Sequence, residues 1–298
     1  MRFEFIMGVA ALALTACSQT PIVSHQDSLT GPEYQGKKYY FGWGEVLDGM
    51  MGNETRYDVL HTHNIFTKNI GGDYIGRKLI DQEFGGSAIR NGWNQIGQSI
   101  HTGDMYLQYS SGHGSPNGLG VGVSYDEMRD KVLSYPVKEA IVFTMSCFSG
   151  NLVDSFNNKR SVWGDWQRDG KTLFVMASSR SNEESSTGPG EDPDEPNGPY
   201  GSAGSAFGHA LWKALIGYAD GAVDGHRDGV IQLGEIAKYV VADTLREGGH
   251  TPVFTGSYNS NLAINRVPTI AEAVRLLGDT DDGRTQLDKL IADGVLVD

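Results

Sequence analysis

Short apolar runs alternate with segments of helical period along the 298-residue chain. Runs of strand length occupy 38–43, 74–79 and 173–177, and two more begin at Asp104 and Ala140. Between and after them, apolar residues recur at helical spacing in 57–68, 88–100, 125–133, 207–215 and 236–245. This alternation predicts a three-layer α/β fold, with a mostly parallel sheet and helices on both faces.

The two runs that begin at Asp104 and Ala140 read as a strand–helix–strand unit, whose strands are parallel and adjacent. His113 follows the end of the first run, and Cys147 follows the end of the second. Catalytic groups in open parallel sheets gather outside the carboxyl ends of the strands. We therefore expect an imidazole and a thiol at one edge of the sheet, which is what a thiol nucleophile with a base requires.

An apolar block ending in His113-Gly114, followed by one ending in Cys147-Phe-Ser-Gly150, resembles the caspase-like cysteine peptidases. The Cys-x-Ser-Gly form is most similar to the legumain family, and the resemblance extends from about Lys37 to Ile264. It implies the caspase-like version of the three-layer fold. It also implies a Cys-His dyad that needs no cofactor, with the N–H groups of Gly114 and Cys147 forming an oxyanion hole.

The same resemblance implies a substrate pocket. Glu184-Ser185-Ser186 matches a Glu-Ser-Ser stretch that follows the catalytic strand in legumains, which makes Ser185 and its neighbour Glu184 candidate substrate-binding residues. Two features depart from the family. Met145 stands where the family has a glutamate, and the family's Arg-His pair after the first strand has no clear match. Asparaginyl specificity is therefore not supported.

The N-terminus predicts a lipid anchor. Arg2 precedes a short apolar segment, and Leu14-Thr-Ala-Cys17 resembles a bacterial lipobox, in which Cys17 would be acylated. The expected organisation is a signal peptide at 1–17, a tether at 18–36, the peptidase domain at 37–265 and a short helical extension at 266–298. We expect the protein in a bacterial cell envelope, held by lipid at the outer membrane.

The number of cysteines and the net charge limit the functions and partners that the protein could have. The chain has two cysteines, so a lipidated Cys17 leaves Cys147 without a disulfide partner, and a lone thiol in an exported protein suggests a reactive group. The formal net charge of −13 argues against a nucleic-acid partner. The expected partners are a peptide or protein substrate and, through the lipid, a membrane.

The segment 224–235 resembles a calcium-binding loop. Asp224, Asp228 and Glu235 occupy positions 1, 5 and 12, and Gly229 occupies position 6, whereas His226 removes one oxygen ligand from position 3. A structural calcium ion is one reading, and a turn that leads into a helix is the other.

The sequence therefore favours a membrane-tethered cysteine endopeptidase that works through an acyl-enzyme. One alternative keeps the dyad but passes the acyl group to an amine, as a transamidase. The other is a non-catalytic, lipid-anchored binding module.

Overall fold

The computed structural model describes residues 34–45, 54–67, 73–80, 85–186, 204–277 and 281–297. The predicted signal peptide, the lipobox with Cys17 and most of the tether lie outside these residues. Within the described ranges, no helix has both the length and the apolar character needed to cross a bilayer.

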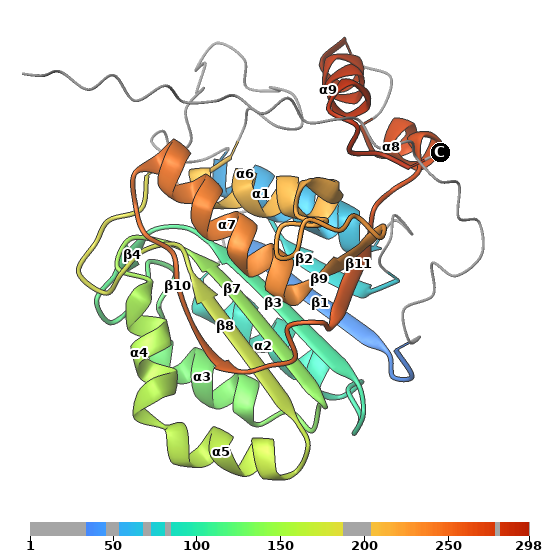
Figure 1. Cartoon of the computed structure of the whole chain (residues 1–298). Coiled ribbons are helices and arrows are strands. Elements are labelled where there is room, and N and C mark those ends of the chain that lie inside the picture. The colour runs from blue at the N-terminus through green and yellow to red at the C-terminus, as the bar shows by residue number, and fades with distance from the viewer. Residues whose placement is uncertain are drawn as a thin grey trace, which may run out of the picture.

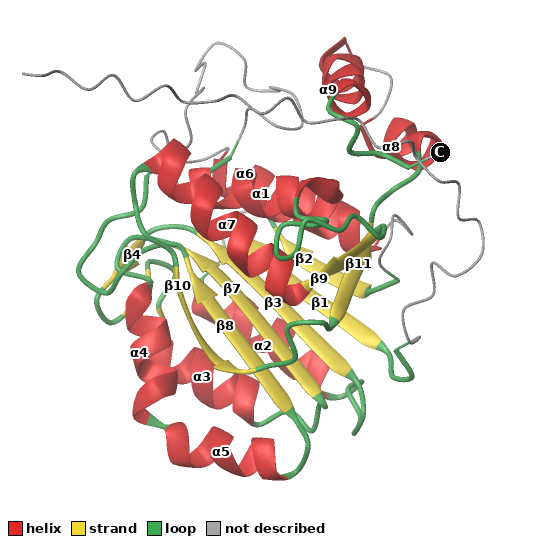
Figure 2. Ribbon diagram, in the orientation of Figure 1, coloured by secondary structure: helices red, strands yellow, loops and turns green. Residues whose placement is uncertain are grey.

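A six-stranded sheet forms the centre of the fold, in the order β10-β8-β7-β3-β1-β2 (Figure 2). Its strands are β1 (Lys38–Gly44), β2 (Ile75–Leu79), β3 (Met105–Ser111), β7 (Glu139–Met145), β8 (Thr172–Ala177) and β10 (Val253–Ser257). All neighbouring pairs are parallel except β10 with β8, which is antiparallel. Strands β3 and β7 are buried along their whole length, which explains why they read as continuous apolar runs.

Helices cover both faces of this sheet (Figure 1). On one face lie α1 (Glu54–Thr67), α6 (Ala206–Lys213) and α7 (Leu233–Gly248); on the other lie α2 (Gly86–Gly97), α3 (Tyr125–Leu133), α4 (Gly150–Asn158) and α5 (Arg160–Arg168). Alternate strand residues face the two sides, so Tyr40 packs in one apolar core and its neighbours Tyr39 and Phe41 pack in the other. The predicted three-layer α/β class is confirmed.

Helix ends follow local sequence signals. The hydroxyl of Ser124 accepts a hydrogen bond from the N–H of Glu127 at the start of α3, and Ser205 does the same for Gly208 in α6. Helix α7 starts with a reciprocal capping box between Gln232 and Glu235. These contacts set where each helix begins after its strand or loop.

Several helices and strands of the structure were not predicted from the sequence. Helix α5 was not predicted, and the glycine-rich stretch after His113 contains a small antiparallel sheet of β4 (Gly114–Ser115), β5 (Gly118–Leu119) and β6 (Val123–Ser124). Strands β9 (Val230–Gln232) and β11 (Ala263–Arg266) form a second small sheet. The π-helix η1 (Ala214–Tyr218) extends α6. Helices α8 (Ile270–Leu277) and α9 (Asp281–Ala292), by contrast, lie in the segment 266–298, where short helices were expected.

Candidate active site

Strands β3 and β7 bring His113 and Cys147 to the same edge of the sheet. The two strands are parallel neighbours, paired up to Ser111 with Met145. The N–H of Gly112 continues the pairing by donating to the Met145 carbonyl at 3.1 Å. Because His113 and Cys147 each lie two residues beyond the last pair, the strand register places them at equivalent positions on the carboxyl edge.

Gly114 packs directly against the backbone of Cys147. A Cβ atom at Gly114 would lie 2.2 Å from the Cys147 carbonyl oxygen and 2.7 Å from the Ser146 hydroxyl, closer than real Cβ contacts allow. A residue with a side chain would therefore push the His113 loop away from the Cys147 loop. The close approach explains physically why glycine follows histidine in this motif.

The turn after Cys147 has an unusual backbone. Phe148 has φ of 59°, in the left-handed region, and is the one non-glycine residue with positive φ among those described. Its N–H donates to the Glu183 carbonyl at 2.8 Å, and its carbonyl accepts from the Asn151 side chain at 2.9 Å. Such conformations persist only where the surroundings hold them, and they cluster at functional sites.

Ser149 and Gly150 join this turn to the segment that follows β8. The buried Ser149 hydroxyl hydrogen-bonds with the hydroxyls of Ser178 and Ser179, at 3.1 and 3.2 Å. A Cβ atom at Gly150 would lie 2.3 Å from the backbone nitrogen of Ser181. The Cys-x-Ser-Gly motif thus fixes Cys147 relative to the segment that contains Ser185.

Ser185 lies against the candidate nucleophile. The Cys147 thiol, partly exposed and free of disulfides, donates to the Ser185 carbonyl oxygen at 3.8 Å. The Ser185 hydroxyl points back into the protein and donates to the Ser146 carbonyl at 2.9 Å. Glu184 is exposed beside it. Ser185 thus borders Cys147, and the substrate-binding role expected of Ser185 and Glu184 stays a prediction.

The His113 ring is exposed, and among the described residues it shares no hydrogen bond with the Cys147 sulfur. Catalytic hydrogen bonds are often long in unliganded enzymes and tighten when substrate binds. The structure thus brings the two loops together and leaves the imidazole open to solvent.

Glu45 is a buried residue that the sequence reading did not single out. It follows β1, its N–H donates to the Ser111 carbonyl at 2.9 Å, and its carboxylate accepts from the N–H of His113 at 2.8 Å. Burial raises the pKa of Glu45, and the N–H and positive charge of His113 oppose that rise. The signal available in the sequence was its position just after the strand predicted at 38–43.

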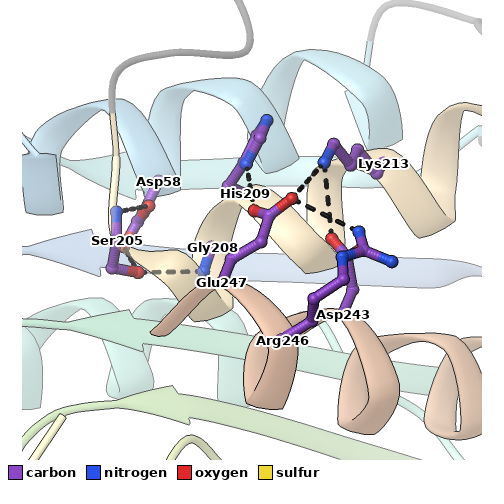
Figure 3. Close-up of polar contacts among 8 residues, drawn as sticks. All are labelled: Asp58, Ser205, Gly208, His209, Lys213, Asp243, Arg246 and Glu247. Atoms are coloured by element: carbon purple, nitrogen blue, oxygen red, sulfur yellow. Dashed lines mark hydrogen bonds and ion pairs between the residues drawn. The ribbon is translucent and has the colours of Figure 1, made fainter. Parts of the chain in front are cut away.

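Asp58 is a second residue that was not predicted from the sequence. Its side chain contacts Ser111 at the end of β3. Its carboxylate accepts from the Ser111 hydroxyl at 2.7 Å, from the Ser205 hydroxyl at 2.7 Å and from the Ser205 N–H at 2.9 Å. Figure 3 shows Ser205 reaching both Asp58 and the N–H of Gly208 at the start of α6. Complete burial raises the pKa of Asp58 to about 6, although these hydrogen bonds oppose the rise.

Charged side chains join α6 to α7 nearby (Figure 3). The Glu247 carboxylate accepts from the His209 ring at 2.9 Å and from the Lys213 ammonium at 2.7 Å. Asp243 pairs with Lys213 and Arg246. His209 is therefore held within this network of charged side chains.

The acidic loop at 224–235 borders a small polar hollow that also includes Ser260 and Asn261. Asp224 and Asp228 each accept a local backbone N–H, and the two Glu235 oxygens accept the N–H groups of Gly221 and Gln232. Among the described residues, no three His, Cys, Asp or Glu side chains are grouped so that they could hold a metal ion. The calcium site stays a prediction, and the turn reading accounts for these contacts.

Fold and site together define an α/β protein with a covered parallel sheet and a thiol at its carboxyl edge. The chain is similar to protein GSU0716 from Geobacter sulfurreducens, with 15% identity and a TM-score of 0.49 over 77% of this chain and 97% of that one. It is also similar to caspase-1 from Spodoptera frugiperda, with 12% identity and a TM-score of 0.49 over 75% of this chain and 89% of that one. No family model and no curated protein matches the chain. At these identities the likeness concerns the fold alone.

Proposed function

We propose that the protein is a cysteine endopeptidase in which Cys147 is the nucleophile and His113 moves the proton. The observation that carries the proposal is the contact between the two loops at the carboxyl edge, where the backbone of Gly114 packs on that of Cys147. A nucleophile and a base that follow adjacent parallel strands are held by the sheet itself.

The reaction would run in two steps. The His113 imidazole takes the thiol proton, the Cys147 sulfur attacks the peptide carbonyl carbon, and the oxyanion that forms is stabilised by the N–H groups of Gly114 and Cys147. The imidazolium then gives its proton to the leaving amine, the C–N bond breaks and a thioester remains. Water, deprotonated by His113, attacks the thioester, and the thiol is regenerated as the acid product leaves.

Peptide-library cleavage by the purified protein, with products identified by mass spectrometry, tests this function. Cys147→Ala should abolish cleavage and active-site alkylation, whereas His113→Asn should reduce both. Adding an amine nucleophile separates hydrolysis from transfer, since a transamidase would give an amine-capped product. A wild-type protein that cleaves no peptide and reacts with no thiol probe would favour a binding module and contradict the proposal.

We further propose that a lipid on Cys17 tethers this peptidase to a bacterial envelope. The lipobox-like sequence supports the anchor, and the mixed polar residues of 18–36 would separate the folded domain from the membrane surface. In a bacterial host, wild-type protein should appear in the membrane fraction and incorporate labelled fatty acid. Cys17→Ser should do neither, and equal membrane binding by both forms would exclude the lipid anchor.

A further inference from the structure

His250 is a buried histidine behind the nucleophile that the proposed reaction does not use. It follows α7 and is 2% exposed. The ring nitrogen Nδ1 donates to the Ser178 carbonyl at 2.6 Å, which leaves Nε2 as the unprotonated nitrogen of the neutral ring. Among the described residues, Nε2 has no hydrogen-bond partner.

A short series of contacts connects this ring with the Cys147 sulfur. His250 holds the backbone of Ser178, and the Ser178 hydroxyl hydrogen-bonds with the hydroxyl of Ser185. The Ser185 carbonyl in turn accepts the Cys147 thiol. The next residue, Ser186, donates through its hydroxyl to the carbonyl of Gly248, two positions before His250.

We propose that His250 is a positioning residue that sets where the Ser185–Ser186 segment lies beside the Cys147 sulfur. The proposal rests on the proposed function, in which this segment borders the bound substrate. It assigns His250 an effect on substrate affinity and on thiol reactivity, without contact with the reacting atoms.

The charge state of His250 makes this position dependent on pH. Burial lowers the pKa of His250, while the carbonyls of Ser178 and Ser186 and the carboxylate of Glu183 oppose that effect. Glu183 is the charged group that faces the ring from the segment after β8, and the nearby Glu247 of α7 is already paired with His209 and Lys213. The ring is thus neutral at neutral pH. In acid, Nε2 gains a proton and can donate to the Ser186 carbonyl, which draws this segment toward α7.

Three variants of the full chain test the proposal. His250→Asn keeps an N–H that can reach the Ser178 carbonyl but does not titrate, and His250→Phe keeps a ring but loses the hydrogen bond. His209→Asn is the control, because it removes a partly buried histidine whose ring contacts are with Glu247 and Trp212. For each protein, the alkylation rate of Cys147 by iodoacetamide and the kcat and KM for a cleaved peptide are measured from about pH 4.5 to 8, across the usual histidine range.

His250→Phe should raise KM about tenfold, the value of one lost hydrogen bond, with a smaller change in kcat. Near neutral pH, His250→Asn should have a KM close to that of wild type. In acid, its alkylation rate should lack the pH-dependent change that wild type and His209→Asn both show. If alkylation and KM match wild type in both His250 variants, the positioning role is wrong. If wild type cleaves no peptide but its alkylation profile still depends on His250, the peptidase function fails while the positioning role holds.

Discussion

The Glu45 carboxylate accepts a hydrogen bond from the backbone N–H of His113 at 2.8 Å, and so ties the candidate base to the end of β1. The carboxylate also fills the space beside Gly112 and Gly120, where a Cβ atom would lie within 3 Å of its oxygens. Glu45 therefore contacts several residues of the loop that contains His113 and helps to set the conformation of that loop.

Replacing this carboxylate should lower activity more than stability. Glu45→Gln keeps the size of the side chain but weakens a hydrogen bond to a charged acceptor, which is worth about 2 kcal/mol and corresponds to roughly a thirtyfold loss in kcat/KM. An unchanged kcat/KM would show that Glu45 does not position His113.

Gly114→Ala should disrupt the site. Its Cβ atom would overlap the Cys147 carbonyl, and a forced shift in packed backbone destabilises by about 1–3 kcal/mol. Cys147 alkylation and peptide cleavage should both fall. Gly164→Ala in α5 is the control, since a Cβ atom there meets nothing within 4 Å and alanine favours the helix. Equal behaviour of the two variants would contradict the close contact.

Asp58 should make the protein less stable as pH rises. The folded-state pKa of about 6 lies above the usual aspartate value of 3.8, so the unfolded chain releases this proton first. The free energy of unfolding therefore falls between about pH 4 and pH 6, by an amount on the order of 3 kcal/mol, and stays lower above that range. Denaturant unfolding of wild type and Asp58→Asn across this range checks the prediction. The variant should lose this fall, and a parallel pH dependence in both proteins would contradict it.

Glu247, unlike Asp58, should make the protein more stable as pH rises. Its hydrogen bond with His209 holds its pKa well below the usual range, burial opposes this, and Lys213 adds to the lowering. The stability that Glu247 contributes is present above its unfolded pKa, near 4.5, and is lost as pH falls below it. Glu247→Gln should lower the free energy of unfolding at neutral pH by about 1–2 kcal/mol, measured by denaturant titration. Glu127→Gln, in the more exposed pair with Arg90, should change it less.

The sequence predicted the sheet and the edge that holds His113 and Cys147, because buried parallel strands leave long apolar runs and the register then follows. It did not predict Glu45, Asp58 or His250, since their roles depend on which segments pack over them. Helix α5 was missed although Trp163 and Trp166 are buried in the core, because its apolar residues are few and its other positions are polar. The three short strands after His113 are two residues each and leave no alternating apolar pattern, so they could not be predicted from the sequence.

The residues that hold the two loops of the candidate site come from nearly the whole length of the domain, from Glu45 after β1 to His250 after α7. A chain still emerging from the ribosome has the cysteine but lacks the residues that would fix its surroundings, since those after Ser178 arrive last. Long-range contacts of this kind form late in folding. The candidate nucleophile would therefore acquire its defined environment only once synthesis of the domain is nearly complete.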